Sequence, residues 1–173
     1  MSIDRLVQSW SEVRTGLINE ASQIPEEKFS FRATPETRSV AEILQHIVQA
    51  QKALVGEACR EDTNLMRQSL ADHINEYAPD VAAVTDKVGL LELLRSSIEP
   101  AKATILGYGD GLQQNMRRFD GKEVTKFDFL NFAVAHEMYH RGQLTVYERL
   151  LGVEPALTQY FNKRFAATTT TND

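Results

Sequence analysis

The sequence is poor in cysteine and contains no long apolar run. Cys59 is the only cysteine, so a disulfide within the chain is excluded and a cytoplasmic location is the simplest expectation. No segment approaches the roughly eighteen consecutive apolar residues that a membrane span requires. The first residues also lack the basic and apolar regions of a secretory signal. We therefore expect no membrane partner.

Dense clusters of basic residues are missing as well. The formal net charge is -5, and Arg117-Arg118 and Lys163-Arg164 are isolated pairs. A protein that binds nucleic acid normally carries a basic patch that displaces counterions from the phosphates. The composition therefore argues against a nucleic-acid partner.

What is present is the composition of one globular domain. The chain has 173 residues, of which 42% are hydrophobic and 25% are charged. This length suffices for one core but hardly for two. We expect a single helical bundle over residues 1–165 and a flexible C-terminal tail over residues 166–173, where four threonines follow one another.

Apolar residues recur at steps of three and four in four long segments, which predicts four amphipathic helices. We expect these helices over residues 3–24, 40–59, 84–106 and 126–151. Ser39 and Glu42 form the pattern of a capping box at the start of the second helix. The fold class is therefore all-α, a four-helix bundle. The long crossover at residues 60–83 permits the second and third helices to run parallel to each other.

Three smaller elements are expected around these helices. The crossover contains a short helix or a packed irregular segment, and residues 116–119 and 123–125 can pair as a short hairpin. Residues 156–165 predict a terminal helix that packs its apolar side chains on the bundle. These side chains are Leu157, Tyr160, Phe161 and Phe165.

The most informative feature is a pair of histidines, His136 and His140, four residues apart in the fourth predicted helix. Residues four apart lie on the same face of a helix, so one cation can bind both imidazoles. Both histidines also continue the apolar stripe of this helix, which includes Phe129, Ala133, Leu144, Tyr147 and Leu151. Two buried imidazoles on a core stripe need polar partners. We therefore predict that this pair binds a metal.

A third ligand is expected from the second helix. His46 lies on or beside the inward face of that helix, next to the small Ala50. Three protein ligands and an open position are typical of a catalytic zinc site. Nickel, iron and copper also bind imidazole, so the histidines do not by themselves identify the metal. The fourth histidine, His73, lies between acidic residues of the crossover and is expected at the surface.

The string from His136 to His140 also spells the HExxH motif of zinc proteases, in which the glutamate is the general base. The later ligand positions do not fit, because Gln143 and Val146 stand where one protease class has glycine and histidine. Glu137 falls about 60° from the centre of the apolar stripe, at about 100° per residue. We interpret it as a solvated boundary residue in preference to a base or a residue that orients a ligand. A peptidase is the least favoured function.

Two stretches resemble the DinB superfamily, the DinB/YfiT-like helical bundles. They are Ser-Val-Ala-Glu-Ile-Leu-Gln-His-Ile at residues 39–47 and His136 followed by His-Arg-Gly-Gln-Leu at residues 140–144. The resemblance covers about residues 1–155. It implies up-down-down-up connectivity and one divalent metal ion, zinc or nickel, bound by His46, His136 and His140. It assigns no role to Glu137. Relatives include thiol transferases that use bacillithiol or mycothiol, mycothiol-dependent maleylpyruvate isomerase, and proteins named as metal-dependent hydrolases.

Two classes of function remain open. The first is a metalloenzyme that activates a thiol or water against a small-molecule substrate, and in the thiol case a low-molecular-weight thiol is the co-substrate. The second is a non-catalytic, stress-related helical dimer with a structural or vestigial metal. We expect a homodimer, with Trp10, Phe132 and Tyr139 as candidate contacts. Arg141 and Gln143 either orient a substrate or pack the fourth helix, and the sequence does not separate these roles.

Overall fold

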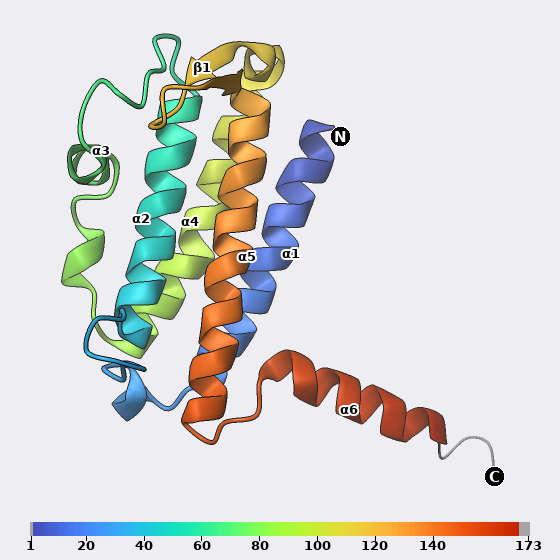
Figure 1. The fold of residues 1–173 in the computed structure, drawn as a ribbon. Helices are drawn as coiled ribbons and strands as arrows, with labels where there is room; N and C mark the ends of the chain where they lie inside the picture. Colours follow the sequence, from blue (N-terminus) through green and yellow to red (C-terminus); the bar gives the residue numbers. More distant parts are fainter. Residues whose placement is uncertain (1, 170–173) are drawn as a thin grey trace.

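Four long helices form the body of the protein (Figure 1). The computed structural model describes residues 2–169, and the long helices are α1 (Ile3–Gln23), α2 (Val40–Ala58), α4 (Lys87–Tyr108) and α5 (Lys126–Leu150). The predicted capping box starts α2: the Ser39 hydroxyl accepts a hydrogen bond from the Glu42 backbone, and the Glu42 carboxylate accepts one from the Ser39 backbone. All four predicted helices are present, but α4 begins at Lys87 and not at residue 84, because the Asp86 side chain accepts a hydrogen bond from the Gly89 backbone and caps the helix there.

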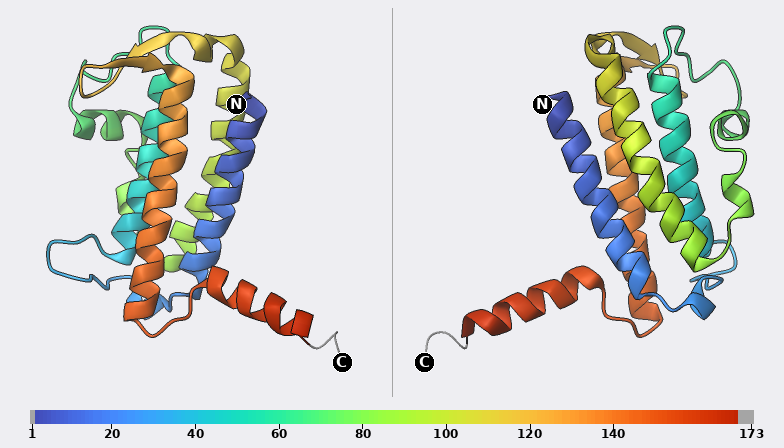
Figure 2. Two further views of the ribbon diagram at one scale, coloured as in Figure 1. Left: turned by 45° about the vertical axis from the view of Figure 1, so that its right-hand side comes forward. Right: turned by 180° about the vertical axis from the view of Figure 1, so that it is seen from behind.

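Two pairs of consecutive long helices, α1 with α2 and α4 with α5, lie diagonally across the bundle, whereas α2 and α4 are side by side. Helix α1 packs against α4 and α5, and α2 packs against the same two helices. Helices α1 and α5 run in one direction, whereas α2 and α4 run in the other (Figures 1 and 2). The connectivity is thus up-down-down-up, as predicted. It requires the crossover between α2 and α4 to return along the whole length of the bundle.

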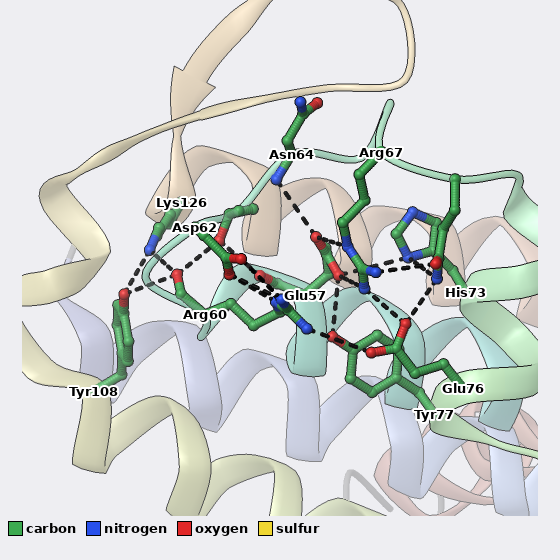
Figure 3. Close-up of polar contacts among 12 residues, drawn as sticks. Glu57, Arg60, Asp62, Asn64, Arg67, His73, Glu76, Tyr77, Tyr108 and Lys126 are labelled. Atoms are coloured by element: carbon green, nitrogen blue, oxygen red, sulfur yellow. Dashed lines mark hydrogen bonds and ion pairs between the residues drawn. The ribbon is translucent and has the colours of Figure 1, made fainter.

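The crossover contains a short helix, α3 (Leu70–Tyr77), and a 3-10 turn at Val81–Ala83. It is fastened to the end of α2 by Glu57, whose side chain is fully buried (Figure 3). The Glu57 carboxylate accepts hydrogen bonds from Arg67 at 2.8 Å and from the Tyr77 hydroxyl at 3.0 Å. Burial alone would raise the pKa of Glu57, but these hydrogen bonds and the charge of Arg67 outweigh burial and lower the pKa.

The same cluster corrects the prediction for His73. Its side chain is buried, with 2% exposed, and not at the surface. Its Nδ1 lies 3.5 Å from the Glu57 carboxylate, and its Nε2 lies 3.2 Å from the backbone oxygen of Leu65 (Figure 3). The surface prediction was wrong because the crossover folds back onto α2, which the local pattern of charges does not reveal.

A small hairpin connects the ends of α4 and α5. Strands β1 (Asn115–Arg117) and β2 (Glu123–Thr125) are antiparallel, with Met116 opposite Val124, which confirms the predicted pairing. The turn contains Gly121 at φ +79°, a conformation that favours glycine. Lys126, the first residue of α5, is buried and donates hydrogen bonds to the Arg60 backbone oxygen and the Tyr108 hydroxyl (Figure 3). The hairpin end of the bundle is thereby tied to the crossover.

The last helix, α6 (Ala156–Thr169), projects from the bundle (Figure 2). The first turn of α6 contacts the C-terminal part of α1. The four apolar side chains that were expected on the bundle are 44% to 65% exposed, so that prediction was wrong. The turn before α6 directs it away, with Gly152 at φ +73° and the Ala156 backbone donating to Glu20. The helix continues past residue 166, where the sequence predicts a tail, and residues 170–173 lie outside the described part.

The core fills the space between the four long helices. Trp10 is buried there with 1% exposed, which makes it a core residue and removes it from the candidate dimer contacts, whereas Phe132 and Tyr139 are 37% and 64% exposed. Within residues 2–169, none of the helices has the length and apolar character that crossing a membrane would need.

One buried carboxylate, near the C-terminal end of α5, has no hydrogen-bond partner among the described residues. Glu148 is fully buried on α5, and neither of its side-chain oxygens is bonded. Burial, together with the charge of Glu20, raises the pKa of Glu148 from 4.5 to about 8. The folded state therefore binds a proton that the unfolded state lacks between these two pH values.

We expect the Glu148→Gln variant to be more stable than the wild type above pH 5. A raised carboxyl pKa makes the wild-type free energy of unfolding fall as pH rises through this window, and glutamine removes that dependence. The difference should grow to the order of 3 kcal/mol near pH 8. Urea unfolding at pH 5 and pH 8 measures it, with the exposed Glu27→Gln as the matched control. Equal pH slopes for wild type and Glu148→Gln would contradict the raised pKa.

Candidate metal centre

Three histidines from two antiparallel helices converge at one place in the bundle. His46 lies on α2, and His136 and His140 lie one turn apart on α5. The Nε2 atom of His136 is 3.1 Å from Nε2 of His46 and 3.1 Å from Nε2 of His140. All three candidate ligand atoms lie within 4.8 Å of one another. The structure thus brings together the three residues that the sequence singled out.

This donor set fits a divalent cation. Nitrogen ligands placed tetrahedrally at zinc–nitrogen distances of 2.0–2.1 Å would stand about 3.3 Å apart. The observed spacing of 3.1 Å between Nε2 atoms is close to that value. Imidazole nitrogen is a ligand that zinc and nickel both accept, so the set does not select between them.

Gln143 holds one of the three rings in the orientation that metal binding needs. Its side-chain oxygen lies 2.7 Å from Nδ1 of His140, one turn earlier on α5. This oxygen accepts the Nδ1 proton, which leaves the Nε2 lone pair of His140 directed at the other two histidines. A partner of this kind is usual behind a metal-binding histidine. Gln143 therefore orients a histidine, a role that neither of the two alternatives from the sequence included.

The electrostatic environment keeps the imidazoles neutral at pH 7. Burial, followed by the charges of Arg38 and the neighbouring histidines, lowers the pKa of His46 to about 3. Burial, His140 and Arg38 lower the pKa of His136 to about 4. The pKa of His140 is also lowered, mainly by burial. Neutral rings retain the lone pairs that a cation requires.

Glu137 is buried and not at the solvated boundary of α5, where the sequence analysis placed it. Its side chain is 2% exposed and points toward α1 instead of solvent. One carboxylate oxygen accepts from Arg14 Nε at 2.5 Å, and the other accepts from Arg14 Nη2 at 2.9 Å and from Trp10 Nε1 at 2.7 Å. Both oxygens are therefore engaged in a buried ion pair. The interpretation of Glu137 as a solvated residue was wrong, and a role as general base loses its support.

Arg14 is the central buried cation that the sequence analysis missed. It is 1% exposed and also donates to the Leu94 backbone oxygen, the Ser97 hydroxyl and the Gln51 side chain. Through these bonds it connects α1 with the other three long helices. A signal was present in the sequence, because Arg14 lies one turn from both Trp10 and Leu17 on the apolar stripe of the first helix.

Arg141 packs the bundle and does not face the histidines. It forms an ion pair with the fully buried Glu20 on α1 at 3.1 Å. Its guanidinium occupies the space where a Cβ would stand on Gly16, so a side chain at this position would displace the guanidinium. This settles the open alternative for Arg141 in favour of packing.

Aromatic side chains and a cavity surround the three histidines. The Phe132 ring centroid lies 6.1 Å from that of His136, and the Tyr139 ring lies 5.2 Å from that of His140. On the side of Gln143 there is a cavity of about 550 Å³. Its lining residues are Glu36, Thr37, Arg38, Ile43, Gln143, Val146 and Tyr147.

Comparisons with known proteins bear on the family and the fold. The profile of the DinB family matches residues 1–172, and a search of curated proteins gives no match. Three solved structures illustrate the likeness. YfiT from Bacillus subtilis, described as a probable metal-dependent hydrolase with an unusual four-helix bundle topology, superposes with a TM-score of 0.69 at 18% identity and covers 89% of this chain and 91% of its own.

A DinB-like protein from Bacillus subtilis gives a TM-score of 0.64 at 21% identity, covering 86% of this chain and 92% of its own. The mycothiol-dependent maleylpyruvate isomerase gives 0.64 at 12% identity, covering 83% of this chain and 61% of its own. At these identities the solved structures establish the fold and leave the reaction open.

Proposed function

The chain belongs to the DinB family, and on that premise we propose that it is a metalloenzyme whose His46, His136 and His140 hold one divalent cation, zinc or nickel. The observation that supports this most is the convergence of three Nε2 atoms, with Gln143 fixing the tautomer of His140. The cation would act as a Lewis acid and lower the pKa of a thiol or a water molecule.

We propose a small-molecule substrate and favour thiol transfer to an electrophile over hydrolysis. The name of the mycothiol-dependent isomerase supports the thiol branch, and the description of YfiT supports the hydrolytic branch. The histidines are neutral and half-buried or buried, so they supply lone pairs and not protons. Glu137 is paired with Arg14, so the HExxH peptidase hypothesis lacks its base and is the least favoured.

The non-catalytic alternative is a homodimer in which the metal is structural. The exposed rings of Phe132 and Tyr139 beside the histidines support it, because such rings are frequent in interfaces. Light scattering of the metal-loaded and chelated protein separates the two ideas. A dimer that dissociates on chelation, without any metal-dependent turnover, would favour the structural role.

A metal-dependent thiol transfer is the expected activity. Protein prepared without chelator or affinity nickel, then loaded with zinc or nickel, should conjugate a low-molecular-weight thiol with monobromobimane at least about tenfold faster than the chelated protein. Bacillithiol, mycothiol and cysteine are the thiols to compare, and restoring the metal to chelated protein is the control. The absence of a metal-dependent rate with every thiol would remove the thiol branch. Metal-dependent hydrolysis of activated esters would then assign the water branch.

A further inference from the structure

Arg38 is a cation without a protein partner beside the metal centre. It precedes Ser39, the N-cap of α2, and its backbone oxygen accepts from the Tyr147 hydroxyl at 2.8 Å. This bond holds the Arg38 backbone against α5. The side chain is exposed, and its guanidinium forms no hydrogen bond or ion pair with any residue that the structure describes.

The cavity of about 550 Å³ that Arg38 lines is also lined by two residues that stand one helical turn from a histidine of the metal centre. Gln143, which bonds to His140 at 2.7 Å, is part of its wall. Ile43, also part of the wall, lies one helical turn before His46 on α2. A molecule in this cavity therefore contacts Arg38 and also the neighbours of two of the three histidines.

The cavity offers an anion one guanidinium, that of Arg38. The one carboxylate in the lining is Glu36, and the hydrogen bond from Thr34 is the largest cause of its lowered pKa. Glu36 is not paired with Arg38, which leaves the guanidinium free to bind a ligand.

We propose that Arg38 binds a carboxylate of the substrate, so that the metal centre acts on a small anionic molecule whose reacting group lies at the histidines. A guanidinium presents a planar fork of donors that matches a carboxylate in a bidentate manner. The cavity walls contributed by Ile43, Val146 and Tyr147 suit a short apolar linker between the two ends. This inference rests on the proposed function, because it assumes a metal at the three histidines.

Matched thiols test the proposal. The probes are mercaptoalkanoates of two, three and four carbons and their uncharged amides, titrated calorimetrically into zinc-loaded protein. We expect at least one mercaptoalkanoate to bind about tenfold or more tightly than its amide, because the thiol binds the metal while the carboxylate binds Arg38. Arg38→Gln should abolish this preference and leave the affinity for the amide within about twofold, whereas Arg38→Lys should keep part of it.

Arg95→Gln is the matched control, since it removes the same charge from an exposed position on α4 and should keep the full preference. Wild-type protein that takes up no zinc would overturn the proposed function and this inference together. Zinc-loaded protein that binds acid and amide equally, or neither, would overturn the role of Arg38 and leave the metal centre intact. A preference that survives in Arg38→Gln would overturn it as well.

Discussion

Replacing both His136 and His140 by alanine is expected to reduce bound divalent metal from about one ion per chain to background. The two residues supply two of the three nitrogen atoms that converge at the site. A single remaining imidazole binds zinc or nickel only weakly, so the affinity should fall by at least about a thousandfold. Elemental analysis of protein prepared without chelator or affinity nickel measures the content, and calorimetry measures the affinity.

Two further variants on α5 make this experiment specific. Gln143→Ala should weaken binding by about 10- to 100-fold, because it removes the acceptor that orients His140 and keeps all three ligands. Tyr139→Ala should leave metal binding unchanged, since its exposed ring contacts His140 without contributing a nitrogen. Alanine is favourable within a helix, so circular dichroism should show that each variant remains folded. Equal metal content in the wild type and the double variant would refute the metal centre.

Replacing Glu137 by glutamine should destabilise the fold by about 3 to 5 kcal/mol, because it leaves the Arg14 guanidinium charged, buried and without its carboxylate. This is a large part of the total stability of a small domain, about 5 to 15 kcal/mol. Urea unfolding followed by circular dichroism measures the loss. Glu99→Gln breaks the exposed ion pair with Lys102 and should cost less than about 1 kcal/mol, so it is the matched control.

The double variant Arg14→Leu, Glu137→Leu tests the cause of that loss. Removing both charges avoids an unpaired ion, so the double variant should be more stable than Glu137→Gln. A general base would behave differently. If Glu137→Gln kept wild-type stability and metal content but lost activity, the ion-pair assignment would be wrong and the HExxH hypothesis would regain its base.

The positions of the elements were predictable because their signals are local. The steps of three and four, the capping box of Ser39 and Glu42, and the pairing of Met116 with Val124 all involve residues near one another in the chain. The inward position of His136 and His140 follows from the stripe on their own helix. The meeting of these two with His46 depended on the family resemblance, since no pattern in one helix identifies its neighbour.

The errors concern residues whose environment is set by distant partners. Glu137 and Arg14 are 123 residues apart in the chain, and each is buried only because the other neutralises it. His73 is buried because the crossover returns to Glu57 on α2. The exposure of the α6 side chains depends on the turn at Gly152 and the bond between Ala156 and Glu20.

By itself, the sequence determined an all-α bundle, the approximate positions of its helices and a pair of inward histidines, because these follow from backbone periodicity over a few turns. The tertiary structure alone decided the rest. It placed His46 opposite that pair of histidines and paired Glu137, the glutamate of the HExxH string, with Arg14. It also placed the unpaired Arg38 in the lining of the cavity. The physical reason is that burial and charge compensation are properties of side chains from different helices, and only packing brings those side chains within a few ångströms of one another.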